Sequence, residues 1–153
     1  MSVEMTRGET VDARALQLQD TMIKLVRAFD LHQPERTPCG EPVPVSEAHA
    51  LMELSRRQAL AQHELGARLR LQRSTVSRLV RQLESRGWVS RDRHASDGRV
   101  AVLSLTASGQ AGVDQLSAAR SAKFARVLEA IPESDRTLVQ AGLSLLVDAA
   151  SRG

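Results

Sequence analysis

Serine and arginine side chains share one face of a helical segment in the middle of this 153-residue chain. The segment is residues 73–86, where Ser74, Ser77, Arg78 and Arg81 recur at helical spacing. The opposite face is apolar and has the spacing of a buried stripe: Val76, Leu79, Val80 and Leu83. Arginine reads guanine in the major groove of DNA, and both residue types bind phosphate. The pattern favours a DNA-recognition helix, and the simpler alternative is an amphipathic helix with a solvated basic face.

A second, shorter helix is predicted just before this segment, over residues 60–69. Ala61, Leu65 and Leu69 fall on one face of it. About three residues then separate the two helices, which is the length of a helix-turn-helix connection. Gly66 lacks a Cβ atom and would let the recognition helix approach closely.

Residues 88–105 are predicted to form a β-hairpin after the recognition helix. Gly87 ends that helix as a C-terminal cap would. Residues 88–93 and 99–105 have the character of strands, and Asp97-Gly98 marks the turn between them. The hairpin carries side chains that suit a phosphate backbone or a minor groove, namely Arg91, Arg93, His94 and Arg99. Residues 46–105 are therefore expected to form a winged helix-turn-helix lobe.

Residues 46–109 resemble the MarR family of bacterial transcription regulators. The resemblance is carried by five motifs: Glu64-Leu65, Ser74-Thr75-Val76-Ser77-Arg78-Leu79-Val80, Leu83-Glu84-Ser85-Arg86-Gly87, Asp97-Gly98-Arg99 and Leu103-Ser104-Leu105-Thr106-Ala107-Ser108-Gly109. Gly66 stands where the family usually has alanine. The terminal segments match the family only in length and position. The expected fold is mostly α with a small β-hairpin wing, in a single MarR-like domain over residues 1–153.

The positive charge is concentrated on the predicted DNA-binding lobe. The whole chain has a formal net charge of +3, but residues 56–99 hold 11 Arg against 4 Asp or Glu, a net of +7. The remainder has a net of −4. This distribution suits a protein that is steered to a polyanion. No apolar stretch reaches the roughly 20 residues of a membrane span, no signal peptide is visible, and Cys39 is the single cysteine, so a cytoplasmic location is expected.

Long amphipathic helices are predicted at both ends of the chain, over residues 11–32 and 107–151. Pro132 divides the second region into two helices. Their apolar stripes need a surface to bury against, and the two subunits of a homodimer would provide it, as the resemblance also implies. Such a dimer would hold two recognition helices about 34 Å apart and read a palindrome.

The segment from Gln33 to Pro44 holds four prolines and a glycine and is predicted to be an extended loop, after which Ser46 caps the next helix. In MarR-like proteins effectors commonly bind close to this position. Three sensing hypotheses stay open: a small organic ligand in an apolar pocket, oxidation of Cys39, and a metal held by His32, Cys39, Glu47 and His49. The pocket would involve Met22, Phe29, His49 and Met52, although these side chains can equally be core.

The expected function is a sequence-specific, DNA-binding transcription regulator, and the family suggests a repressor that an effector releases. Arg73, Ser74, Ser77, Arg78 and Arg81 would be the helix contacts, Thr75 would support them, and Asp97 would hold the wing residue Arg99 in an ion pair. The alternative is a sequence-tolerant architectural DNA-binding protein. An enzyme is not expected, because no nucleophile, base and orienting residue cluster together and no chain length remains for a catalytic domain. No cofactor or structural metal is expected.

Overall fold

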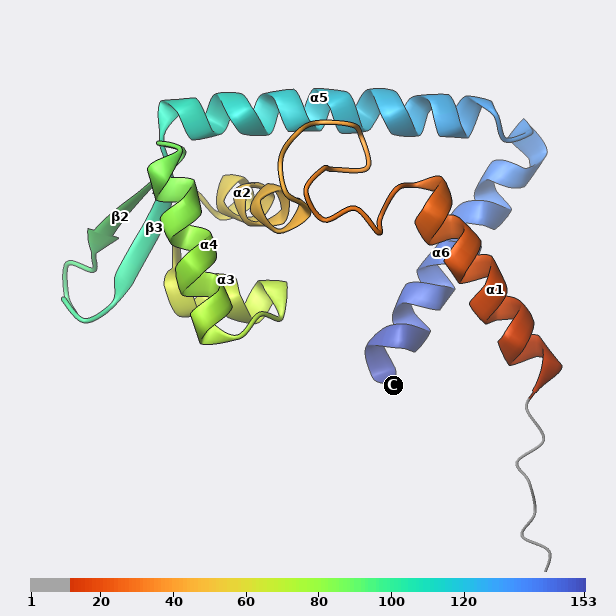
Figure 1. Cartoon of the computed structure of the whole chain (residues 1–153), viewed down its shortest axis with the longest axis horizontal. Coiled ribbons are helices and arrows are strands. Elements are labelled where there is room, and N and C mark those ends of the chain that lie inside the picture. Colours follow the sequence, from red (N-terminus) through yellow and green to blue (C-terminus); the bar gives the residue numbers. More distant parts are fainter. Residues whose placement is uncertain (1–11) are drawn as a thin grey trace, which may run out of the picture.

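The computed structural model describes residues 12–153 as six helices and one three-stranded sheet. The helices are α1 (Ala13–Ala28), α2 (Val45–Arg57), α3 (Gln62–Leu69), α4 (Arg73–Ser85), α5 (Ala107–Glu129) and α6 (Glu133–Arg152). The strands are β1 (Ala59–Ala61), β2 (Val89–Arg93) and β3 (Ala101–Leu105). Figure 1 shows that α5 is the longest element and joins two groups. The lobe of α2, α3, α4 and the sheet lies at one end of α5, and α1 and α6 lie at the other.

The predicted winged helix-turn-helix is confirmed, with one strand more than expected. The sheet has the order β1-β3-β2 and is antiparallel throughout. Strand β1 occupies the start of the segment predicted as a helix from residue 60, so that prediction was wrong for its first two residues. The strand pairs Leu60 with Leu103 and has only three residues, too few to display an alternating pattern.

The core of the lobe gathers the apolar faces of α2, α3, α4 and the sheet. Its most buried large side chains are Leu51, Leu54, Leu65, Val80, Leu83 and Leu103. The predicted apolar face of the recognition helix is confirmed, because Val76 and Leu79 are also at most 3% exposed. Gly66 gives the predicted close approach, since a Cβ atom on it would lie 3.0 Å from Cγ2 of Val76. The polar face of α4 is thereby held away from the core.

Several helix ends differ from the sequence-based prediction. Helix α1 ends at Ala28 instead of residue 32, because Asp30 takes a left-handed conformation with φ of 54° and the Leu31 amide bonds back to the Val26 carbonyl. The start predicted at residue 11 lies outside the described residues. Ser46 is not the N-cap of α2. Pro44 occupies that position, since its φ of −54° and ψ of 140° lead directly into the helix.

Gly87 ends the recognition helix as predicted. It has φ of +72°, and its amide bonds to the Glu84 carbonyl while the Trp88 amide bonds to the Leu83 carbonyl. This pair of hydrogen bonds is a Schellman motif, which favours glycine at the left-handed position. The turn delivers the chain directly into β2.

The loop before α2 is non-helical, as predicted, but it is folded into turns and not extended. Thr37 is buried, and its backbone and hydroxyl groups bond to Glu41 and Gly40. The Gln115 side chain of α5 donates a hydrogen bond of 2.9 Å to the Glu41 carboxylate. The loop therefore closes over α5 between the lobe and the terminal helices (Figure 1).

Candidate nucleic-acid interface

The polar face of α4 is turned to solvent. Arg73, Ser74, Arg78 and Arg81 are exposed, and Ser77 and Thr75 are half-buried. The Arg81 Nε atom donates a long hydrogen bond of 3.3 Å to the Ser77 carbonyl, so its guanidinium lies along the helix. All six side chains predicted to serve DNA binding from this helix thus lie on or beside its solvent-facing side.

Helix α3 adds a polar side chain that the sequence analysis missed. Gln62 donates a hydrogen bond of 3.0 Å from its amide nitrogen to the hydroxyl oxygen of Ser77. The bond joins the first residue of α3 to the middle of α4 across the helix-turn-helix. With its oxygen accepting from Gln62, the Ser77 hydroxyl can direct its own proton towards an acceptor outside. Helical periodicity could not reveal this contact, because the two residues belong to different helices.

The wing carries its five predicted residues on the surface, at Arg91, Arg93, His94, Asp97 and Arg99. The predicted ion pair between Asp97 and Arg99 is wrong: the Asp97 carboxylate accepts the backbone N–H of Arg99 at 3.0 Å. A two-residue separation within a tight turn brings that amide to the carboxylate before the long guanidinium can reach it. Arg99 is therefore held through its backbone, and its side chain is directed outwards.

One wing arginine is tied to the recognition helix. Arg91 forms an ion pair of 3.1 Å with Glu84 near the end of α4. His94 accepts hydrogen bonds at Nδ1 from the backbone and hydroxyl of Ser96, at 3.2 and 2.8 Å, when that nitrogen carries no proton. The Arg91–Glu84 pair joins β2 to α4, and the His94–Ser96 bonds stabilise the turn at the wing tip.

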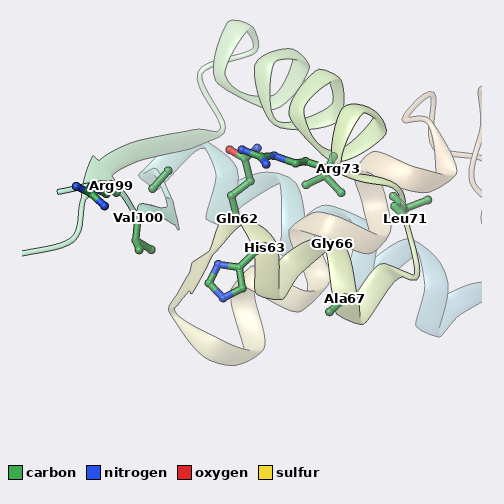
Figure 2. Close-up of a pocket in the computed structure, with 10 residues that line it drawn as sticks. Gln62, His63, Gly66, Ala67, Leu71, Arg73, Arg99 and Val100 are labelled. Carbon is green, nitrogen blue, oxygen red and sulfur yellow. The ribbon is translucent and has the colours of Figure 1, made fainter. Parts of the chain in front are cut away.

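A cleft of about 450 Å³ separates the start of α4 from the wing. Figure 2 shows α3 along one side of this cleft, with Arg73 reaching over it from α4 and Arg99 at the edge of the wing. Its apolar lining includes Gly66, Val76 and Val100, and its polar lining is Gln62, His63, Arg73 and Arg99. His63 is not among the DNA-binding residues predicted from the sequence.

An ion pair between a buried carboxylate and a partly exposed guanidinium anchors the far end of α4. Glu47 in the first turn of α2 is 2% exposed, and its Oε2 atom lies 2.8 Å from the Arg86 Nε atom. No described donor meets this oxygen with the direction of a good hydrogen bond, so the contact is mainly electrostatic. Burial raises the pKa of Glu47, Arg86 acts in the opposite direction, and Glu35 adds to the rise. The Arg86 guanidinium also lies 5.2 Å from the centre of the Trp88 ring.

A second cavity, of about 530 Å³, lies where the loop meets α2, the end of α3, and α5. It brings together three residues predicted for an effector pocket, Cys39, His49 and Met52. Phe29 does not line the cavity but stacks on Phe124, which does, with the ring centres 5.7 Å apart. Met22 does not join them, because it lies on a separate hollow along α1. Further residues lining the cavity are Glu53, Arg56, Arg68, Leu69, Arg70 and Arg120.

Two observations bear on the other sensing hypotheses. The Cys39 thiol contacts the Thr37 hydroxyl at 2.9 Å beside the second cavity. Across residues 12–153, no three His, Cys, Asp or Glu side chains come together as a metal site would need, and Glu47 is engaged by Arg86.

Over the same residues, no helix combines the length and apolar character that crossing a membrane requires.

Comparison with known proteins identifies the family. Residues 43–101 match the model of the MarR family. The chain is 30% identical over 113 residues to an HTH-type transcriptional regulator of Mycobacterium leprae, covering 73% of each chain. It is 28% identical over 120 residues to the HTH-type transcriptional repressor MdtR of Bacillus subtilis, covering 77% of each. The fold matches that of the PcaV regulator of Streptomyces coelicolor, solved with its natural ligand, with a TM-score of 0.61, 22% identity and coverage of 98% and 99%. The chain belongs to the MarR family of winged helix-turn-helix transcription regulators, whose members are not enzymes.

Proposed function

We propose that the protein is a dimeric, sequence-specific repressor that reads a palindromic operator and is released from it by an effector. The observation that carries this proposal is the exposed serine and arginine face of α4 beside a basic wing. Repression is supported by the similarity to MdtR, which is named a repressor. In this arrangement residues 46–105 bind DNA, and residues 11–32 and 107–151 dimerise.

The side chains of α4 would enter the major groove, and the wing would reach the neighbouring minor groove. Arg73, Arg78 and Arg81 would contact guanine edges or phosphates, with Ser74 and Ser77 as shorter donors and Thr75 as their support. On the wing, Arg99 would enter the minor groove, Asp97 would hold its backbone, and the remaining contacts would be made by Arg91, Arg93 and His94.

Replacing Arg78 with alanine is expected to weaken operator binding by about 1–3 kcal/mol, the value of one bidentate arginine–guanine contact. The measurement is fluorescence anisotropy with the DNA upstream of the protein's own coding region and with scrambled DNA of equal length. The wild-type protein should favour the former by about 10³-fold or more. Because Arg78 would read a base, the variant should lose affinity for the operator and little for scrambled DNA.

The matched control is Arg152→Ala at the end of α6, which removes the same charge far from α4 and should leave the preference intact. Equal binding of the wild-type protein to both DNAs would favour the sequence-tolerant architectural alternative, with a steep salt dependence on each. An Arg78 variant that binds the operator normally would remove Arg78 from the reading surface.

The proposed dimer rests on apolar side chains that one subunit leaves uncovered. Helices α1 and α6 contain no buried residue, and Leu138, Leu145 and Val147 of α6 are 72%, 69% and 63% exposed. Leu128 and Phe124 of α5 and Leu16 and Leu18 of α1 add to this surface. A second copy of the chain, related by a two-fold axis, would cover the same patch on both subunits.

The double substitution Leu138→Glu and Leu145→Glu is expected to give a monomer, because it puts two carboxylates seven residues apart on one face of α6. Light scattering should show twice the subunit mass for the wild-type protein and the subunit mass for the variant. Ser144→Glu adds a carboxylate to the polar face of the same helix, which Thr137 and Asp148 share, and should remain dimeric. A dimeric double variant would assign the interface elsewhere.

The effector is expected in the second cavity and is proposed to be an organic anion. Arg70 and Arg120 line it without a carboxylate partner among the described residues, whereas Arg56 and Arg68 face Glu53 at 3.1 and 3.9 Å. Met52, Leu69 and Phe124 offer an apolar wall for a ring. The similarity to PcaV, a regulator solved with its natural ligand, supports the presence of an effector site. Screening aromatic carboxylates for release of operator DNA in the same assay tests the proposal, and release that survives Arg120→Ala would place the site elsewhere.

A further inference from the structure

The cleft between α4 and the wing has the composition of an anion site. Its polar lining consists of Arg73, Arg99, His63 and Gln62, and it contains no carboxylate. Its apolar lining combines the small residues Gly66, Ala67 and Ala101 with the larger side chains Leu71, Val76 and Val100. A volume of about 450 Å³ leaves room for a phosphate together with its deoxyribose.

The position of the cleft indicates which anion would bind in it, and this inference rests on the proposed function. If α4 occupies a major groove and Arg99 the adjacent minor groove, one sugar-phosphate strand separates those two grooves. That strand must run between α4 and the wing, which is where the cleft lies (Figure 2). In helix-turn-helix proteins the first of the two helices crosses the backbone, and here that helix is α3.

We propose that this cleft seats one DNA backbone phosphate and that His63 binds it in its protonated form, which makes DNA affinity depend on pH. Arg73 and Arg99 flank the same phosphate. Gln62 is already engaged, because its amide nitrogen donates to Ser77 at 3.0 Å. His63 is exposed and has no hydrogen-bond or ion-pair partner in the described part of the chain, so its ring is the side chain of α3 that remains available.

The charged groups around His63 come from α3, α4 and the wing. Arg73 from α4 and Arg99 from the wing line the same cleft. A neighbouring hollow places Glu64 of α3 and His94 and Asp97 of the wing on the other side of His63. Both carboxylates there accept backbone N–H groups, Glu64 from Ala61 at 2.9 Å and Asp97 from Arg99 at 3.0 Å.

A phosphate in the cleft would place negative charge beside His63. It lies against the two arginines and favours the imidazolium form of His63, so DNA binding takes up a proton. By linkage, the DNA affinity rises as the pH falls through the range in which histidines titrate, between about pH 5 and 8. Because a phosphate contact releases a counterion, the salt dependence also steepens at the lower pH.

The test measures binding of the full-length protein to an operator fragment selected from random DNA, at about pH 6 and about pH 8 over a series of salt concentrations. The wild-type protein should bind on the order of threefold to tenfold tighter at the lower pH. The slope of log affinity against log salt concentration should be steeper there by about 1.8 for the dimer, which is about 0.9 for the phosphate bound by each subunit. In His63→Asn, which keeps a polar side chain but cannot be protonated, both differences should vanish. Because the contact reads no base, His63→Asn should weaken binding to scrambled DNA by a similar factor.

Two further variants complete the test. His63→Arg carries a permanent charge, so at the higher pH it should bind as tightly as the wild-type protein does at the lower pH. His32→Asn removes a histidine just after α1 and should keep the wild-type pH dependence. Circular dichroism at both pH values checks that every variant is folded.

Loss of the pH dependence in His94→Asn together with its retention in His63→Asn would overturn the proposal and assign the proton to the wing. Retention of both the pH and the salt differences in His63→Asn would overturn it as well. A wild-type protein that fails to prefer the operator to scrambled DNA at either pH would instead overturn the proposed function, so the two failures are distinguishable.

Discussion

Replacing Gly109 with alanine is expected to destabilise the protein by about 3 kcal/mol, because the new methyl group has no space. Gly109 lies in the first turn of α5, and a Cβ atom on it would be 2.0 Å from the Trp88 carbonyl oxygen and 2.9 Å from the carbonyl carbon. Both are backbone atoms and cannot rotate away. The N-cap residue Thr106 donates from its amide to the same oxygen at 3.0 Å and from its hydroxyl to the Gly87 carbonyl at 2.6 Å. The substitution must separate α5 from the turn that ends α4.

Urea denaturation at a fixed protein concentration measures this loss. Gly112→Ala, one turn further along α5, is the matched control because its nearest neighbour would be the Trp88 ring at 3.8 Å, an ordinary contact. That substitution should be neutral or stabilise the protein by up to about 1 kcal/mol through helix propensity. Equal stabilities for the two alanine variants would show that the junction between α5 and α4 adjusts freely.

Replacing Arg86 with alanine should destabilise the protein by about 2 kcal/mol at neutral pH, because it leaves the Glu47 carboxylate buried without its counter-charge. The expected loss is below that for a fully buried pair, since the Arg86 side chain is 42% exposed and partly solvated already. The variant also loses the contact between the guanidinium and the Trp88 ring.

The pH dependence of this loss has a definite sign. Burial raises the pKa of Glu47 above its unfolded value, so its contribution favours folding at pH values below the unfolded pKa and is lost as the pH rises through the folded pKa. Arg86 lowers the pKa of Glu47, and without it the pKa rises further. The Arg86 variant should therefore be closest to the wild-type stability in acid and fall behind as the pH rises to neutral.

Glu47→Gln combined with Arg86→Ala supplies the control, because the double variant buries a neutral amide in place of the carboxylate. It should recover part of the stability at neutral pH and lose the difference between acid and neutral pH. Urea midpoints measured from about pH 4 to about pH 7 give both quantities. A loss in Arg86→Ala that is the same at every pH would mean that Glu47 is not the group responsible.

The recognition helix could be predicted because burial against a single core fixes the spacing of its apolar residues. Val76, Leu79, Val80 and Leu83 bury a single face, so the residues between them must face solvent. The turn at Gly87 was predictable for a similarly local reason, since a left-handed residue at a helix end favours glycine. Features that depend on residues close together in the sequence could therefore be predicted.

Features that depend on residues close only in space could not be predicted. The bond from Gln62 to Ser77 joins residues 15 positions apart, and the pair of Glu47 with Arg86 joins two helices. Strand β1 exists because β3 offers it an edge, and nothing within its three residues predicts a strand. The residues predicted for the effector pocket are split between two sites for the same reason. Cys39, His49 and Met52 line one cavity, whereas Met22 lies on a separate hollow along α1.

Trp88 gives this protein a built-in optical probe. It is the one tryptophan of the chain, and the chain has no tyrosine, so its indole dominates the intrinsic fluorescence. The ring is half-buried, with Gly112 of α5 on one side and the Arg86 guanidinium on another. It therefore lies between the end of α4 and the first turns of α5, where a tilt of one helix relative to the other would change its surroundings. A change of emission on adding DNA or an effector would therefore report movement at the base of the recognition helix, in unlabelled protein and in real time.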